Sequence, residues 1–344
     1  MALLAVAMLE ANQAAAESGM VRACRGDYQQ FCTGVRPGGG AIRECLAQHA
    51  AELSAQCRHA AAAQMSRSTG GGTAVGLDDA GAPARRIALP AGASVIRDLA
   101  YGPHAAQRMD VYLPAHPHDA PVLLMVHGGG WAVGDKAAAG VVANKVARWL
   151  PQGYIFISVN NRLLPDADPI EQADDVARAL AAAESKARSW GGDPAKFVLI
   201  GHSAGAHLVA LLAADPAITA RNGAGPWLGT ITLDSAAFDI AQIMQGSHFR
   251  LYDRAFGSDP AFWRKASPTY RLSAAPAPML LVCSSRRANS CPQARGFADK
   301  AIARRGRVTV LPVAMTHGEI NKDLGLAGNY TQAVESFLRS LGLP

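Results

Sequence analysis

The chain has 344 residues, of which 49% are hydrophobic and 17% charged, a composition typical of globular proteins and long enough for one large domain or two. The net charge of +6 comes from 33 basic and 27 acidic residues, with no basic cluster interleaved with aromatics, which argues against nucleic-acid binding. Beyond the N-terminus there is no apolar run of the roughly 18 residues that a membrane-spanning helix needs, so no membrane span is predicted.

Residues 1–19 have several features of an export signal. A short apolar stretch covers residues 2–9, and the alanines at 14–16 would suit a signal peptidase, although the usual positive charge at the start is missing. An ordinary N-terminal helix is the alternative. Together with the cysteine content, this segment predicts a periplasmic or secreted protein.

Residues 20–63 are predicted to form a small helical hairpin. Two alanine-rich helical patterns flank a glycine-rich break, and a hairpin of this size cannot bury enough core to fold unaided. Four of the six cysteines lie here, so disulfides would supply the missing stability. An antiparallel hairpin places its outer cysteines opposite each other, and likewise the inner ones, which favours a nested pairing over the other two connectivities: Cys24 with Cys57 and Cys32 with Cys45.

A zinc site is the alternative use of these cysteines, but their spacings of 7, 12 and 11 intervening residues include no C-x2-C knuckle. The stretch also resembles the cysteine-rich repeat of Golgi glycoprotein type, which implies a structural or interaction module and thus a protein contact rather than chemistry. The residues that carry this resemblance are Cys24–Tyr28, Phe31-Cys32, Pro37–Gly40, Cys45-Leu46, Glu52–Ser54 and Cys57.

Residues 64–89 are predicted to be a linker, because their central part is Ser, Gly, Thr and Ala with little apolar content. Residues 90–344 follow as a second domain, in which short apolar strands alternate with helical patterns. This alternation predicts an α/β domain with a doubly wound, mostly parallel sheet after an initial antiparallel pair. Strands are expected at 95–99, 108–113, 121–126, 154–159, 196–200, 228–233, 279–283 and 307–311, and helices at 171–189, 206–213, 293–303 and 330–341, with one more ending at 150.

Residues 239–272 interrupt this alternation as an irregular excursion rich in aromatics. The segment could cap a cleft, or its aromatics could simply pack a surface insertion. Both interpretations stay open at this stage.

The sequence Gly201-His-Ser-Ala-Gly205 lies between a predicted strand and a predicted helix. In G-x-S-x-G, the glycines permit a turn so tight that the central serine is strained and its hydroxyl is exposed above the sheet edge. Ser203 is therefore a candidate nucleophile. The alternative role for a serine at such a turn is a helix N-cap.

Other polar residues also fall at the carboxyl ends of predicted strands, where ligand sites of parallel sheets lie. Several ordered motifs here resemble those of α/β-hydrolases, closest to the lineage of hormone-sensitive-lipase-like carboxylesterases and formamidases. The resemblance implies a serine esterase or related acyl hydrolase without metal or organic cofactor. The motifs are His127–Trp131 (HGGGW), Gly134–Lys136, Ser158–Asn160, Arg162-Leu163, Gly191–Pro194 and Gly201–Gly205.

Acyl transfer by a serine needs a base, a group that orients the base, and donors for the oxyanion. The resemblance implies that the backbone amides of Gly129, Gly130 and Ala204 form the oxyanion hole. His317 follows the last strand, and its position after Ser203 is the chain order of α/β-hydrolases, so His317 is the expected base.

The group that orients the base departs from the family pattern. The family places its acid in the loop corresponding to residues 283–292, which contains no carboxylate. Asn289 occupies the expected position, with Ala288 as the next choice; the equivalent exchange of aspartate for asparagine in a serine protease lowers turnover by roughly 10⁴. Asp234, at the end of the preceding strand, is the alternative acid, unless it serves only the sheet. The two cysteines that bracket the loop would rigidify it if bridged: Cys283 and Cys291.

Two functions follow from these residues. The first is an exported serine esterase that forms an acyl-enzyme on Ser203, with a small-molecule or polymer-linked ester as substrate. The second is a catalytically weakened α/β-hydrolase domain that serves in binding, with the cysteine-rich hairpin as its protein contact. The missing carboxylate favours the second function. The first is favoured by His317 and by two intact motifs, the serine turn (Gly201–Gly205) and the glycine loop (His127–Trp131).

Overall fold

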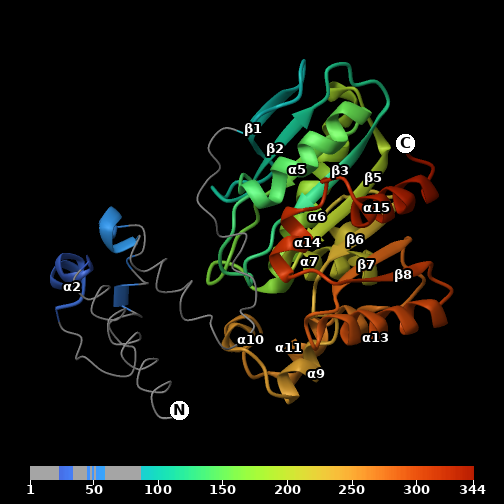
Figure 1. The fold of residues 1–344 in the computed structure, drawn as a ribbon. Helices are drawn as coiled ribbons and strands as arrows, with labels where there is room; N and C mark the ends of the chain where they lie inside the picture. Colours follow the sequence, from blue (N-terminus) through green and yellow to red (C-terminus); the bar gives the residue numbers. More distant parts are fainter. Residues whose placement is uncertain (1–22, 34–44, 47–48, 50–51, 59–86) are drawn as a thin grey trace, which may run out of the picture. The chain divides into compact units, whose positions relative to one another are not determined.

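The computed structural model describes residues 23–33, 45–46, 49, 52–58 and 87–344 (Figure 1). The chain divides into two compact units, residues 1–74 and 75–344. The predicted export signal and nearly all of the predicted linker lie outside the described residues, so both stay predictions.

The first unit is cross-linked by the predicted nested disulfides, Cys24–Cys57 and Cys32–Cys45. Its described helix is α2 (Arg25–Phe31). The buried carboxylate of Asp27 accepts hydrogen bonds from the backbone N–H and the hydroxyl of Ser54, at 2.5 and 2.7 Å. Since all six cysteines of the chain are paired in disulfides, none is left as a zinc thiolate. The resemblance to a Golgi-type repeat stays a prediction.

The second unit is built on one eight-stranded sheet in the order β1-β2-β4-β3-β5-β6-β7-β8. β2 pairs antiparallel with β1 and β4, and every other neighbouring pair is parallel, as the sequence predicts. The strands are β1 (Ser94–Ala100), β2 (Arg108–Leu113), β3 (Ala120–Val126), β4 (Ile155–Val159), β5 (Gly192–His202), β6 (Gly229–Leu233), β7 (Met279–Ser284) and β8 (Val308–Val313).

Helices cover both faces of the sheet (Figure 1). Successive side chains of β3 enter different apolar cores, because strand side chains alternate between faces: Leu124 packs in the core that contains Leu208, and Leu123 in the core that contains Trp149. β3 is therefore apolar at every position. The main helices are α5 (Ala139–Trp149), α6 (Pro169–Lys186), α7 (Ala204–Ala214), α8 (Pro216–Arg221), α13 (Ser290–Ala303), α14 (His317–Lys322) and α15 (Asn329–Ser340).

Helix α7 is buried along its whole length. Its many alanines suit this position, because small side chains let a helix pack closely against the sheet and a neighbouring helix. Helix α6 begins with a complete capping box, in which Asp168 accepts from the N–H of Glu171 and the Glu171 side chain accepts from the N–H of Asp168.

The excursion between β6 and β7 is more regular than the sequence predicts. It contains four short helices: α9 (Ile240–Gln245), α10 (Arg250–Phe256), α11 (Pro260–Lys265) and α12 (Pro268–Arg271). The longest of these helices has 7 residues and the shortest has 4, which is too short for a clear apolar period. In the described part of the chain, no helix combines the length and apolar character needed to cross a membrane.

Reduction of the disulfides should loosen the first unit before the second. The described apolar cluster of the first unit consists largely of its cysteines, so loss of the cross-links removes most of its stabilisation. In hydrogen exchange read by mass spectrometry, we expect residues 52–58 to lose protection in reductant while β3 and β5 keep theirs. Equal loss of protection in β3 would contradict this expectation.

Candidate active site

Ser203 lies at the turn between β5 and α7. Its backbone is strained for a residue with a side chain, with φ 52° and ψ −114°. Glycine is required on either side of it: a Cβ at Gly205 would lie 2.3 Å from the carbonyl oxygen of Val126, and one at Gly201 would lie 2.3 Å from that of Gly205. The N–H of Ser203 donates to the carbonyl of Leu233 at 2.9 Å, which ties the turn to β6.

The side chain of Ser203 has no capping role. It forms no hydrogen bond to the first turn of α7, so the N-cap interpretation of this serine does not hold. The residue is 8% exposed and lines a small pocket with a cavity volume of ≈ 10 Å³. A hydroxyl that neither caps a helix nor packs in the core is available for chemistry.

Besides the serine turn, the walls of this pocket come from four segments: the glycine loop after β3, residues 234–237 after β6, helix α10, and the loop after β7. Trp131 of the glycine loop packs against Tyr252 and Phe256 of α10, with ring centroids 5.8 and 4.8 Å apart. Leu251 of α10 also lines the pocket. The aromatic excursion therefore both packs on the domain and forms part of the pocket wall.

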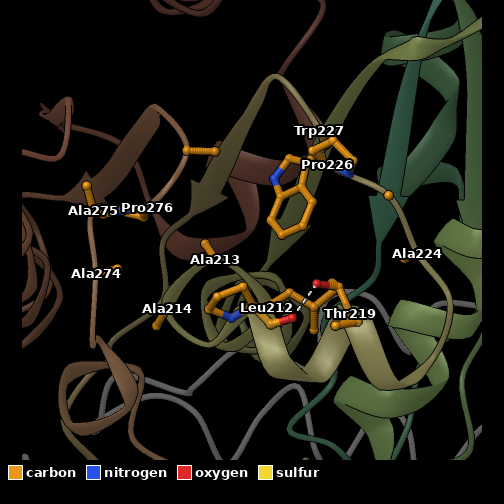
Figure 2. Close-up of a pocket in the computed structure, with 14 residues that line it drawn as sticks. Leu212, Ala213, Ala214, Thr219, Ala224, Pro226, Trp227, Ala274, Ala275 and Pro276 are labelled. Carbon is orange, nitrogen blue, oxygen red and sulfur yellow. Dashed lines mark hydrogen bonds between the residues drawn. The ribbon is translucent and has the colours of Figure 1, made fainter.

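A larger pocket, with a volume of ≈ 270 Å³, lies away from Ser203 (Figure 2). It is lined by Trp227 and residues 274–277, which directly precede β6 and β7, and by Pro216 of α8. Those are the amino ends of the strands, whereas ligand sites of such sheets lie beyond the carboxyl ends. None of the predicted site residues lines this pocket.

The glycine loop has a conformation at Gly129 that a residue with a side chain rarely adopts. Gly129 has φ +112°, and a Cβ there would lie 2.0 Å from the carbonyl oxygen of Val133. The carbonyl of Gly129 accepts from the N–H of Ala132 and Val133, at 3.2 and 3.1 Å. Because the peptide bond is planar and trans, the N–H of Gly130 points the opposite way. Gly130 lines the Ser203 pocket together with Ala204, the first residue of α7, whose N–H has no acceptor within the helix.

His317 is the first residue of α14, a helix that the sequence analysis did not predict. Its Nδ1 lies 2.6 Å from Oδ2 of Asp234, and its Nε2 is buried without a hydrogen-bond partner among the described residues. Burial and the neighbouring His202 ring lower the pKa of His317 to about 4. The imidazole is therefore neutral at neutral pH, with Nε2 free to accept a proton.

Asp234 ends β6 and is completely buried. Oδ1 accepts from the backbone N–H of Ser284 at 2.7 Å and from the hydroxyl of Ser290, and Oδ2 accepts from the Arg287 guanidinium at 2.6 Å. Burial alone would raise the pKa of Asp234, but the hydrogen bond from His317, the charge of Arg287 and the hydrogen bond from Ser290 outweigh it and hold the pKa well below its usual range.

The structure does not bring Asn289 to His317. Asn289 is an exposed residue at the N-cap position of α13 and makes no capping hydrogen bond, and Ala288 beside it is also exposed. The hydrogen-bonding position on Nδ1 is taken by Asp234, the alternative that the sequence left open. The expectation for Asn289 assumed that the acid stays in the loop after β7, whereas in this fold the carboxylate reaches the ring from the end of β6.

The loop after β7 instead supplies donors to Asp234. Ser284, Arg287 and Ser290 were not singled out from the sequence, although a loop that lacks its expected acid and carries arginines is a signal for a carboxylate elsewhere. The Cys283–Cys291 disulfide closes this loop. The bridge suggested by the sequence is thus present.

Two further histidines near the serine turn have structural contacts. His202 lies with Nε2 3.1 Å from the carbonyl of His317, so it holds the start of α14. His207 is buried between the indole N–H of Trp131, 3.2 Å from Nδ1, and the carbonyl of Ala266, 2.7 Å from Nε2. Burial lowers the pKa of His207 to about 4, so this ring is neutral.

Comparison with known proteins shows that the chain is similar to esterases. A family model described as BD-FAE matches residues 109–225, a range that contains the glycine loop and Ser203 and ends before Asp234 and His317. Esterase LipC of Mycobacterium tuberculosis is 29% identical over 268 residues, covering 71% of this chain and 65% of the relative. A probable isoprenylcysteine alpha-carbonyl methylesterase ICME of Oryza sativa subsp. japonica is 29% identical over 130 residues, covering 38% and 31%. The chain thus spans less than two thirds of the length of these relatives.

Solved structures agree on the fold. Esterase B from Lactobacillus Rhamnosis (HN001) matches with a TM-score of 0.61 at 20% identity, covering 75% of this chain and 87% of that chain. The apo form of Thermogutta terrifontis esterase 2 matches with a TM-score of 0.60 at 21% identity, covering 74% and 97%. The second unit therefore has the predicted α/β-hydrolase fold.

Replacement of Asp234 should be far more damaging to ester hydrolysis than replacement of Asn289. Asp234→Asn removes the charge that accompanies a protonated His317, and we expect kcat to fall by roughly 10³ to 10⁴. Asn289→Ala changes an exposed side chain and should leave kcat within about twofold. Steady-state kinetics on one activated ester measure both. If Asn289→Ala lowered kcat more than Asp234→Asn, the acid position would lie in the loop after β7.

Stability should fall as the pH drops from about 6.5 towards 4. His207 and His317 are neutral in the folded protein at neutral pH, with a pKa of about 4 each, whereas the ordinary pKa of a histidine in an unfolded chain is about 6.5. The unfolded state therefore binds more protons in this range, and each such histidine lowers the free energy of unfolding by about 1.4 kcal/mol per pH unit.

Urea denaturation at pH 7, 5.5 and 4.5 measures this loss. His207→Gln removes one of the two titrating groups, so its stability should depend less on pH over the same interval. An unfolding free energy that stays constant between pH 7 and 4.5 would contradict the assignment of both rings as buried and neutral.

Proposed function

We propose that this protein is a serine carboxylic-ester hydrolase that forms an acyl-enzyme on Ser203. The observation that carries the proposal is the buried pair of His317 and Asp234, whose Nδ1 and Oδ2 lie 2.6 Å apart. The opposite ring nitrogen, Nε2, has no partner among the described residues, and the strained Ser203 lies at the same carboxyl edge of the sheet. The esterase relatives support the same reaction class.

In the proposed reaction, Nε2 of His317 takes the proton of the Ser203 hydroxyl as Oγ attacks the ester carbonyl. The carbonyl oxygen becomes an oxyanion, which accepts hydrogen bonds from the amides of Gly129, Gly130 and Ala204. Loss of one such donor costs about 2.7 to 4 kcal/mol in comparable enzymes.

His317 then returns the proton to the leaving alcohol, and the acyl group stays on Ser203. In the second half, His317 takes a proton from water, whose oxygen attacks the acyl carbon. His317 then returns this proton to Oγ of Ser203 as the acyl bond breaks, which releases the carboxylic acid and the free serine. The negative charge of Asp234 stabilises the imidazolium that forms in each half.

The alternative function, a weakened domain used only for binding, rested on the lack of a carboxylate near His317. Asp234 supplies that carboxylate with a hydrogen bond to Nδ1. The argument for lost activity therefore no longer holds, and the esterase is the function that we propose. A protein contact through residues 20–63 stays a separate prediction.

For substrate we propose esters with short acyl groups. The pocket beside Ser203 is small, and Leu251 lies opposite Gly130: a Cβ at Gly130 would be 3.9 Å from Cδ1 of Leu251. A long acyl chain would have to displace Trp131, Leu251 or Tyr252, which line the pocket.

We also propose that the protein is exported to the periplasm or secreted. All six cysteines are paired, in the Cys24–Cys57, Cys32–Cys45 and Cys283–Cys291 bridges. Stable disulfides are typical of oxidising compartments. Fractionation of cells that express the full chain, followed by thiol labelling, tests the proposal: cytoplasmic protein with free thiols would contradict it.

Ser203→Ala should abolish ester hydrolysis and labelling by a fluorophosphonate, while the melting temperature changes little because the hydroxyl contributes little to packing. Mass spectrometry of the wild-type protein should place the phosphonyl group on Ser203. Residual turnover of the variant above about 1% would remove Ser203 from the nucleophile position.

Activity should decline as the acyl chain of a p-nitrophenyl ester lengthens from acetate to octanoate. Leu251→Ala opens the wall of the pocket and should move the preferred chain length upward, with kcat/KM for the acetate nearly unchanged. Exposed Phe249, at the N-cap of the same helix, gives the matched control: Phe249→Ala should leave the chain-length profile as in the wild type. Equal activity on all chain lengths would contradict the short-acyl proposal.

A further inference from the structure

Arg287 lies at the centre of the charged cluster beside Ser203. One nitrogen of its guanidinium is 2.6 Å from Oδ2 of Asp234, 3.1 Å from the backbone carbonyl of Asp234, and 2.8 Å from Nδ1 of His317. The side chain is largely buried and also lines the Ser203 pocket. Arg287, Asp234 and His317 therefore meet in a triangle with sides of 2.6 to 2.8 Å.

For a neutral His317, the triangle allows two arrangements of protons. A guanidinium donates and never accepts, so Nδ1 of His317 either donates to Asp234 while Arg287 also donates to Asp234, or accepts from Arg287. In the second arrangement the ring proton sits on Nε2, which then cannot take a proton from Ser203. A carboxylate is the better acceptor for the guanidinium, so the first arrangement is favoured.

We propose that Arg287 is a positioning residue for the hydrolytic reaction: it anchors the Asp234 carboxylate and keeps His317 neutral, with the Nδ1 proton directed at Asp234. This inference rests on the proposed function. Arg287 acts through Asp234 and His317, with no bond to the reacting atoms.

The charge of Arg287 predicts in which direction the protonation of His317 changes when Arg287 is removed. Asp234 is fully buried and needs a nearby cation. With Arg287 present, that need is met without a proton on His317, whereas without Arg287 a protonated His317 becomes the only close cation. The groups that face His317 or helix α14 are His202 of β5, Asp234 of β6, Arg287 after β7, Glu319 of α14, Lys145 of α5 and Tyr330 of α15.

The position of Arg287 is fixed by the loop that carries it. The Cys283–Cys291 disulfide closes this loop, and the N–H of Ser284 and the hydroxyl of Ser290 bind the other oxygen of Asp234. Both carboxylate oxygens are therefore held by one closed loop, with Arg287 supplying its only positive charge at Asp234 among the described residues.

The test is the pH dependence of kcat/KM for p-nitrophenyl acetate, and of the rate at which a fluorophosphonate labels Ser203, in three variants. In Arg287→Gln we expect the acid limb of both profiles to move up by at least about one pH unit, because His317 binds a proton more readily. In Arg287→Lys the charge remains, so the acid limb should stay near the wild-type position while kcat falls, since an ammonium lacks the planar geometry of the guanidinium.

Arg286→Gln is the matched control. Arg286 is the neighbouring exposed arginine, 3.5 Å from the exposed Glu319, and its replacement should leave both profiles unchanged. An acid limb in Arg287→Gln that coincides with the wild type would overturn the proposal. Should that variant fail to fold, Arg287→Lys decides: a displaced acid limb with unchanged kcat overturns the proposal, and an unchanged limb with reduced kcat supports it.

The test of the role of Arg287 can be distinguished from the test of the proposed function. If Ser203→Ala retains hydrolysis, the nucleophile assignment fails whatever the Arg287 variants do. If Ser203→Ala is inactive and Arg287→Gln keeps the wild-type acid limb, only the role of Arg287 fails.

Discussion

The negative charge of Asp234, buried at the end of β6, is the constraint on which the site depends. A buried carboxylate is stable only when it is paired and hydrogen-bonded. Here the partners come from three later segments: Ser284 from β7, Arg287 and Ser290 from the disulfide-closed loop and α13, and His317 from α14. The hydrogen bonds and the ion pair that stabilise the Asp234 carboxylate therefore also hold these segments together at the carboxyl edge of the sheet, beside Ser203.

The same edge combines rigidity with unsatisfied groups. Strain at Ser203 and the buried Nε2 of His317, which has no partner among the described residues, are each unfavourable in isolation. They persist because β5, β6 and β7 are buried and hold the turns in place. Groups left without partners in a rigid frame are what a reacting ester can satisfy, and this links the packing of the sheet to the proposed chemistry.

Much of the fold follows from the sequence, because the central strands are buried on both faces and their apolar runs are long and bounded by glycine and proline. The glycine loop and the serine turn are equally local, since Gly129 and Gly205 have no room for a side chain. The acid position is different. Whether Asn289 or Asp234 reaches His317 depends on the direction in which two loops leave their strands, and sequence spacing does not determine that direction. Arg287 was missed for the same reason.

A crystal structure of the protein after reaction with a short-chain phosphonate ester tests the account most directly, because it traps the geometry of the acylation step. We expect phosphorus bonded to Oγ of Ser203, its oxygen within hydrogen-bond distance of the amides of Gly130 and Ala204, and Nδ1 of His317 still bonded to Asp234. A phosphonyl group on another residue, or a His317 ring turned away from Asp234, would contradict the account.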